Sequence, residues 1–155
     1  MEKLKHVDLY TDGACSQNGT WTGGYGAVLI YGEYQKQISG FRKNTTNNQM
    51  ELLAVIEGLK MLKERVDLTI YTDSAYVCNA FANNWIQSWQ TNGWKNSQNK
   101  PVSNKEMWQE LIDLCSKHQV LFQKVKGHAD NEYNNLCDKL ATTAIKEHDD
   151  NNKDA

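Results

Sequence analysis

The chain carries LYTDGA at residues 9–14 and IYTDSA at residues 70–75, so that Tyr-Thr-Asp, a small residue and Ala occur twice. Two fragments this short do not indicate a duplicated module. The simpler interpretation is two parallel neighbouring strands, which sets Asp12 and Asp73 at the same level, about 4.8 Å apart. Because Asp is disfavoured in strands, and two carboxylates about 4 Å apart repel by roughly 4 kcal/mol at an effective dielectric near 20, a compensating group is expected beside them.

The segments around this repeated motif predict five strands. Residues 6–12 alternate between two unlike faces, the period of two that is typical of a strand. Two runs rich in aromatic and β-branched residues flank Gly32-Glu33 and predict a hairpin. The apolar run that holds the second copy of the motif predicts a buried strand, and a similar run follows later in the chain. The expected strands cover residues 6–12, 25–31, 34–42, 68–72 and 120–125.

Helices are expected between and after these strands. The sequence TTNNQ at 45–49 places Thr46 and Gln49 at the spacing of a capping box, in which each side chain satisfies a free helix N–H, and Ser103 and Glu106 repeat that spacing. Four helices are expected: one over residues 47–64, one that begins near Ala75, one that follows Ser103 and one over about 131–147. Residues 84–102 are expected to form an irregular segment that starts as a helix. This order predicts an α/β fold, a single mixed five-stranded sheet (antiparallel meander plus parallel strands) flanked by helices.

Two further acids lie near the expected N-terminal ends of helices, Glu51 in the first helix and Asp138 in the last. If those ends face the carboxyl edge of the sheet, where open α/β sheets usually place their sites, four carboxylates converge. Either a shared proton or a bound cation would offset the repulsion between Asp12 and Asp73, but one proton cannot neutralise four acids. Ligation by carboxylate oxygens with room for water suits Mg²⁺ or Mn²⁺ rather than Zn²⁺.

Each of these acids also has an interpretation without chemistry. Asp12 and Asp73 could each end a strand by hydrogen-bonding the next turn, and Glu51 and Asp138 could be solvated helix residues. His128 lies on a glycine-containing loop before Asp138. A loop histidine is commonly just exposed, whereas one close to the acids could carry a proton. The set of residues is therefore more informative than any of its members.

Residues 84–105 hold three lysines and no acidic residue, within a chain whose net charge is −2. Cations interleaved with flat aromatic side chains suit the sugar-phosphate backbone of a nucleic acid. The alternative is that two of the tryptophans, spaced i and i+4, pack on the core. Both interpretations can hold together. The lysines are Lys95, Lys100 and Lys105, and the tryptophans are Trp85, Trp89 and Trp94.

Length and composition limit the classes of protein that remain. A chain of 155 residues with 39% hydrophobic and 23% charged residues fits one soluble globular domain and excludes a disordered chain. No apolar run approaches the roughly 20 residues that cross a bilayer, and no secretory signal is visible. The four separated cysteines suggest neither a zinc site nor a disulfide framework. We therefore expect a cytoplasmic monomer with no membrane association and no obligate protein partner.

Seven stretches together make the chain similar to ribonuclease HI over about residues 5–146. They are YTDGAC at 10–15, GGYGA at 23–27, TTNNQMEL at 45–52, YTDS at 71–74, WQTNGWK at 89–95, VKGHA at 125–129 and CDKLA at 137–141. The resemblance implies the ribonuclease H-like fold and endonucleolytic hydrolysis of the RNA strand of RNA·DNA hybrids, by two-metal-ion catalysis, leaving 5′-phosphate and 3′-hydroxyl ends. It implies a catalytic domain over residues 1–147, with a basic, Trp-rich handle at about 84–102. The polar residues at the end of the chain, 148–155, are expected to form a flexible tail.

The resemblance also implies roles for individual residues. The metal-binding acids of the family correspond to Asp12, Glu51, Asp73 and Asp138. These would hold two Mg²⁺ ions in the working complex, and Mn²⁺ could substitute. The auxiliary histidine falls on His128. The family's polar substrate contacts correspond to Asn18, Asn47 and Asn48. Its contacts to a DNA phosphate correspond to Thr46 and Asn104. The handle that binds the hybrid corresponds to a segment that includes Trp85, Trp89, Trp94, Lys95 and Lys100.

The chain departs from the family pattern at a few contact positions. Residues 90–92 are Gln-Thr-Asn where well-known bacterial relatives carry several cations, and Ala75 stands where many relatives have an amide. Asn44 stands where relatives often have Arg, and Arg42 or Lys43 could substitute. Two other functions stay open. A non-catalytic hybrid-binding module is disfavoured because all four acids and His128 are present. A DNA-cutting relative, such as a junction resolvase or integrase core, is disfavoured by the TTNN stretch and the handle.

Overall fold

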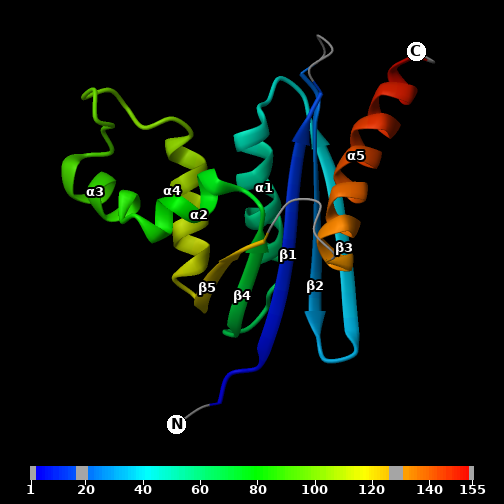
Figure 1. Cartoon of the computed structure of the whole chain (residues 1–155), viewed down its shortest axis with the longest axis horizontal. Coiled ribbons are helices and arrows are strands. Elements are labelled where there is room, and N and C mark those ends of the chain that lie inside the picture. The colour runs from blue at the N-terminus through cyan, green and yellow to red at the C-terminus, as the bar shows by residue number, and fades with distance from the viewer. Residues whose placement is uncertain (1–2, 17–20, 126–130, 154–155) are drawn as a thin grey trace.

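The computed structural model describes residues 3–16, 21–125 and 131–153 (Figure 1). Within these ranges five strands form one sheet and five helices pack around it. The strands are β1 (His6–Cys15), β2 (Gly23–Tyr31), β3 (Tyr34–Arg42), β4 (Asp67–Thr72) and β5 (Gln119–Lys124). The helices are α1 (Asn47–Lys60), α2 (Ala75–Ala82), α3 (Trp85–Asn92), α4 (Lys105–Cys115) and α5 (Glu132–Lys153).

The strands follow the order β3-β2-β1-β4-β5 across the sheet. The pairs β1–β2 and β2–β3 are antiparallel, whereas β1–β4 and β4–β5 are parallel. The mixed five-stranded sheet and the parallel neighbours carrying the repeated motif are thus confirmed. Leu9 pairs with Ile70 and Tyr10 with Tyr71, and the two tyrosine rings stack with centroids 4.4 Å apart. This register places the aspartates that follow at the same end of the sheet.

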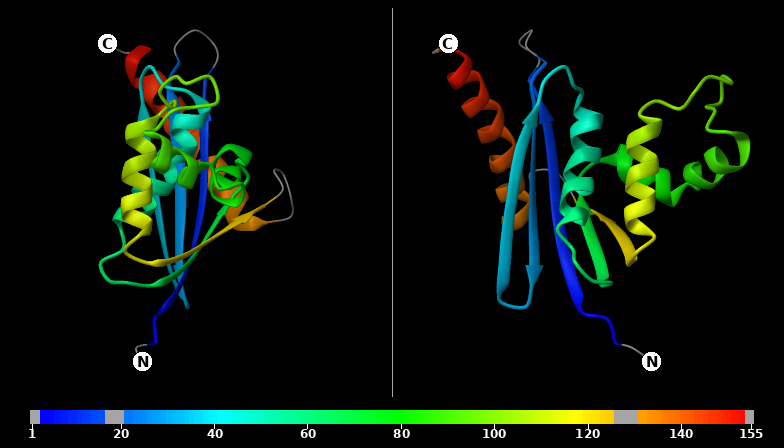
Figure 2. Two further views of the ribbon diagram at one scale, coloured as in Figure 1. Left: turned by 90° about the vertical axis from the view of Figure 1, so that its left-hand side faces the viewer. Right: turned by 180° about the vertical axis from the view of Figure 1, so that it is seen from behind.

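Helices cover both faces of the sheet. In Figure 2 the sheet lies between α5 and α1, and α3 lies at the end of the molecule remote from α5. The main core lies between the sheet, α1 and α4, and a smaller one lies between the sheet and α5. The apolar residues of α1 are buried in the main core. Fully buried side chains of the main core include Leu9, Leu52, Val55, Leu59, Ile70, Trp108 and Leu111.

The first two strands are longer than the sequence predicts. The β1–β2 ladder continues through Asp12 opposite Gly26 as far as Cys15 opposite Gly23, whereas the expected strands covered residues 6–12 and 25–31. Glycine is depleted in strands, so the glycines at the start of β2 did not indicate a strand in the sequence. The extended ladder carries Asp12 inside a paired strand and not at the strand's end.

The two predicted capping boxes differ from what forms. The Thr46 hydroxyl accepts a hydrogen bond from the Gln49 N–H at 3.2 Å, but the Gln49 side chain bonds Thr45 and Asn104 and does not return to the helix end. The second capping box is wrong, because α4 begins after Asn104, which has φ 61° and whose side chain makes no capping bond. Asn tolerates this left-handed backbone, and its amide is engaged elsewhere.

The last helix is also longer than expected. The predicted end at about residue 147 is wrong, since α5 continues to Lys153. Its buried face includes His148, whose ring stacks on Phe41 with centroids 4.1 Å apart, so the packing of this helix continues past residue 147. The flexibility predicted for residues 148–155 stays a prediction. Although α5 has 22 residues, neither it nor another helix in the described ranges is apolar enough to cross a membrane.

Glycines in β2 allow α5 to approach the sheet at backbone distance. A Cβ at Gly24 would lie 2.1 Å from the Ala141 carbonyl oxygen, and one at Gly26 would lie 2.4 Å from the Cys137 carbonyl oxygen. Gly26 is the ladder partner of Asp12. The close approach therefore brings the start of α5, which carries Asp138, to the part of β1 that carries Asp12.

Substituting Gly24→Ala is expected to lower the free energy of unfolding by about 3 kcal/mol, because the added methyl group meets helix backbone that cannot move alone. Urea unfolding of the variant measures the loss. Gly40→Ala is the matched control on the adjacent strand, where the nearest atoms to the new Cβ belong to the end of the Tyr25 side chain, which can rotate away. Equal stability of the two variants would contradict the proposed backbone contact.

Candidate metal centre

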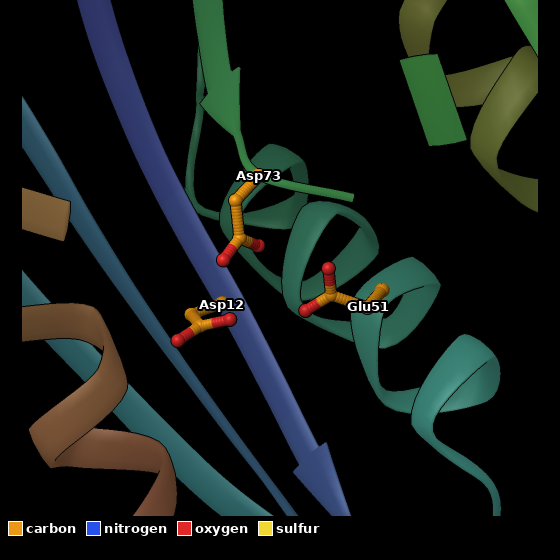
Figure 3. A group of neighbouring side chains, drawn as sticks. All are labelled: Asp12, Glu51 and Asp73. Atoms are coloured by element: carbon orange, nitrogen blue, oxygen red, sulfur yellow. The ribbon is translucent and has the colours of Figure 1, made fainter. Parts of the chain in front are cut away.

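Three carboxylates from distant parts of the sequence meet at one end of the sheet. Each of Asp12, Glu51 and Asp73 offers an oxygen within 4.8 Å of the oxygens of the other two. Figure 3 shows the three side chains pointing toward one another from β1, from α1 and from the residue that follows β4. Asp12 and Glu51 are both buried. This is the convergence that the repeated motif and the position of Glu51 in its helix predicted.

Gly13 lets β1 and α1 touch next to this cluster. A Cβ at this position would lie 2.4 Å from the Met50 carbonyl carbon and 2.5 Å from the Glu51 nitrogen. Its N–H donates to Asp12 Oδ1 at 2.9 Å and also to Glu51 Oε1. A single backbone donor thus holds two of the acids in place. Any larger residue would push the helix, and Glu51 with it, away from the strand.

Hydroxyl groups rather than Asp73 organise the turn after β4. The Ser74 N–H donates to Thr72 Oγ1 at 3.1 Å, and Ser74 Oγ accepts from the Val77 N–H at 3.2 Å as the N-cap of α2. The interpretation of the aspartates as residues that end a strand by bonding the next turn is therefore wrong for both. Asp12 accepts its bond from the Gly13 N–H inside the β1–β2 ladder. After β4 the neighbouring hydroxyls make the bonds of the turn, and the Asp73 carboxylate faces the cluster.

Asp138 borders the same site without joining the tight group. It lines a cavity of about 490 Å³ together with Asp12, Glu51 and Asp73. Its charge acts on Asp12, since it is one of the causes that raise the Asp12 pKa. The fourth acid is thus brought to the site by α5, at its edge, as the close approach of α5 to β2 requires.

Burial and crowding make the acids hard to ionise. The pKa of Asp12 is raised to about 7, mainly by burial and then by the charges of Asp73 and Asp138. Burial raises the pKa of Glu51 well above its usual value, and the charges of Asp12 and Asp73 raise it further. The hydrogen bond from the Gly13 N–H acts in the opposite direction and lowers it. A proton or a cation is therefore needed at neutral pH. The donor atoms are all carboxylate oxygens, which are the preferred ligands of Mg²⁺ and Mn²⁺.

The predicted substrate residues divide between two neighbouring cavities. Asn47 and Asn48 line the cavity of the acids, and Thr46 caps the helix that begins with them. Asn104 lines a second cavity of 380 Å³. Asn18 and His128 lie outside the described residues. Two lining residues were not predicted as part of the site: Tyr76 lines the first cavity and Gln49 lines the second. The signal in the sequence that could have indicated Tyr76 is its place one turn after Asp73.

The predicted handle combines both interpretations of its tryptophans. Trp89 and Trp94 are partly buried against the core, with the Trp89 ring centroid 5.5 Å from that of Trp108, so the packing interpretation holds for them. Trp85 stays 37% exposed. The side chains of Lys95 and Lys100 are exposed as well. The segment can therefore present cations and one aromatic surface to a ligand while its other tryptophans hold it on the core.

Comparisons with known proteins show the family of this chain. The family model for RNase H matches residues 4–146. The chain is 57% identical over 143 residues to a protein named Ribonuclease H from Acetivibrio thermocellus, covering 92% of this chain and 97% of the relative. It is similar to the crystal structure of LC9-RNase H1, a type 1 RNase H with the type 2 active-site motif, with TM-score 0.83 and 27% identity over 95% of this chain and 75% of the other.

A more distant structure shares the fold alone. The crystal structure of LC11-RNase H1 in complex with an RNA/DNA hybrid superposes with TM-score 0.70 at 18% identity, covering 92% of this chain and 98% of the other.

Proposed function

The chain belongs to the RNase H family of nucleases, and we propose that it cleaves the RNA strand of RNA·DNA hybrids internally, leaving 5′-phosphate and 3′-hydroxyl ends. The observation that carries this proposal is the group of three acids with mutually close oxygens, bordered by Asp138 and by two asparagines in one open cavity. A hydrolytic site for phosphodiesters needs charge neutralisation at the phosphate and polar groups that orient the backbone.

The four acids fit a pair of divalent cations, Mg²⁺ or in its place Mn²⁺. Asp12, Glu51 and Asp73 would hold them, with Asp138 completing the set from the edge of the cavity. When bound, such ions stabilise the charge that develops on the attacking and leaving oxygens of an in-line displacement. The chain's own contribution is to keep the carboxylates in place, which the Gly13 N–H does for two of them.

Other residues orient the hybrid and choose the strand. Asn47 and Asn48 lie beside the acids, where amide groups can bond the 2′-hydroxyls that distinguish RNA from DNA. Thr46 and Asn104 would contact a phosphate of the DNA strand, and the handle would bind the same strand further along. We also propose Asn18 as a substrate contact and His128 as an auxiliary group for water activation or product departure.

The direct test is incubation with an end-labelled RNA·DNA hybrid, with and without Mg²⁺, beside duplex DNA and duplex RNA. We expect Mg²⁺-dependent internal cuts in the RNA strand of the hybrid alone, with product ends that a polynucleotide ligase and kinase can identify. Cutting of duplex DNA would instead support a DNA-cutting relative of the same fold. Hybrid binding without cutting in any metal would support a non-catalytic module.

The weakly basic handle predicts a shallow salt dependence of hybrid binding. Gln90 and Thr91 lie on α3 where cations would add phosphate contacts. In the double variant Gln90→Lys, Thr91→Lys, the slope of log K against log salt is expected to become steeper by up to about 1.8, roughly 0.9 for each new contact. Fluorescence anisotropy over a salt series, in EDTA, measures both slopes. Identical slopes would reject a role for this face of α3 in binding.

A further inference from the structure

A chain of hydrogen bonds joins three helices between the two cavities. The Trp108 Nε1–H donates to the Tyr76 hydroxyl at 2.9 Å, and Asn104 Nδ2 donates to the same hydroxyl at 3.2 Å. Gln49 Nε2 donates to Asn104 Oδ1 at 3.0 Å, and the Thr45 hydroxyl donates to Gln49 Oε1 at 2.8 Å. The Asn104 side chain is therefore held on both of its polar atoms.

Both ends of this chain are anchored in the interior. Trp108 is fully buried and Thr45 is 3% exposed. An indole nitrogen can only donate, so the Tyr76 oxygen accepts, and the bond from Trp108 fixes its position. At the same time Asn104, although it precedes α4, makes no capping bond with its side chain. Its amide bonds Tyr76 and Gln49 and does not bond the N-terminal end of α4, where an Asn side chain commonly stabilises a helix.

The clamped amide faces a cavity suited to an anion. Two cations, Arg42 and Lys105, line this cavity against one acid, Glu106. An Asn amide has two N–H groups, and Tyr76 takes one of them, which leaves the other for a phosphate oxygen. Tyr76 also lines the cavity of the acids. The hydrogen-bond chain thus sets the position of one binding cavity relative to the other.

We propose that Tyr76 and Gln49 are positioning residues, which hold the Asn104 amide toward a phosphate of the uncleaved strand and so align that strand with the acids. This inference rests on the proposed function, because it assumes a hybrid whose two strands occupy the two cavities. A preformed amide loses little freedom when it binds, so the clamp contributes to affinity for the hybrid and not to the chemical step.

The test is Tyr76→Phe, which removes only the hydroxyl, with Gln49→Leu as a second variant that releases the other side of the amide. Binding of a hybrid in EDTA by anisotropy, and steady-state cleavage with Mg²⁺, give Kd, KM and kcat. We expect Kd and KM to rise about 5- to 10-fold with kcat changed less than about twofold. Tyr34→Phe is the matched control, since Tyr34 is exposed and lines neither cavity.

A double-mutant cycle separates positioning from mere stabilisation. In the Asn104→Ala background, Tyr76→Phe is expected to change Kd less than about twofold, because the group through which it acts is gone. A hybrid with a single neutral methylphosphonate in the DNA strand should likewise lose its sensitivity to Tyr76→Phe at the contacted position. A lower melting temperature with unchanged Kd and KM, or additive effects in the cycle, would overturn the inference alone. Failure of the unaltered protein to bind and cut the hybrid would overturn the proposed function as well.

Discussion

Asp73→Asn is expected to lower the rate of Mg²⁺-dependent hybrid cleavage by about 10³-fold or more, equivalent to at least about 4 kcal/mol of transition-state stabilisation. Asp73 supplies one of the three mutually close carboxylate oxygens, and an amide in its place keeps the shape of the side chain but removes the negative charge. The loss should appear in kcat. The affinity for the hybrid, measured in EDTA, should change by less than about threefold, because the two asparagines and the handle remain.

The matched control for this variant is Asp67→Asn, at the other end of the same strand. Asp67 is exposed and pairs with His6 at 3.1 Å, and it lines no part of the acid cavity. Its substitution should leave kcat and Kd unchanged. Retention of full cleavage by Asp73→Asn would reject the proposed metal centre, whereas equal loss of cleavage and of hybrid binding would show that Asp73 acts on the substrate and not on the chemistry.

Asp12→Asn is expected to stabilise the protein in the absence of divalent metal at pH 8, by up to about 4 kcal/mol. The pKa of Asp12 is about 7 in the folded chain and close to the ordinary value of 3.8 in the unfolded chain. The folded state therefore binds more protons than the unfolded state between these values, so the free energy of unfolding falls as the pH rises from about 4 to about 7. The difference between the two pKa values corresponds to about 4 kcal/mol once Asp12 is ionised.

Urea unfolding in EDTA at pH 4.5 and pH 8 measures this effect. The gain from Asp12→Asn should be small at pH 4.5 and large at pH 8, while Asp113→Asn, an exposed acid on α4, should change stability by less than about 0.5 kcal/mol at both. The raised pKa of Glu51 acts in the same direction. A variant no more stable than the unaltered protein at pH 8 would show that these carboxylates are not crowded in solution.

The same crowding predicts stabilisation by metal. At a Mg²⁺ concentration ten times its Kd, the unaltered protein should gain about 1.4 kcal/mol, because the ion binds the folded chain and replaces the protons that the acids otherwise require. The gain should be largely absent in Asp12→Asn. Thermal melting at pH 8 over a Mg²⁺ series measures it, and a melting temperature independent of Mg²⁺ would contradict a cation-binding role for the cluster.

Much of the site could be predicted because its first elements are local. Strand periodicity and the repeated motif are properties of short segments, and parallel neighbours with the same motif place Asp12 and Asp73 together whatever surrounds them. Glu51 followed from the helix whose start Thr46 marks. The glycine-rich ladder of Gly13 and Gly26 was not predictable in the same way, since glycine carries no side chain whose pattern would indicate a strand.

Sequence alone therefore determined the mixed sheet, the order of its elements and the four acids expected to converge, because backbone preference and side-chain alternation act over a few residues. Only the tertiary structure decided that Gln49 bonds Asn104 and not its own helix end, that Asn104 leaves α4 without a side-chain cap, and that α5 reaches β2 closely enough to bring Asp138 to Asp12. These outcomes depend on groups from distant segments that compete for the same hydrogen bond or the same space. A pattern within a few residues cannot predict which group makes the contact.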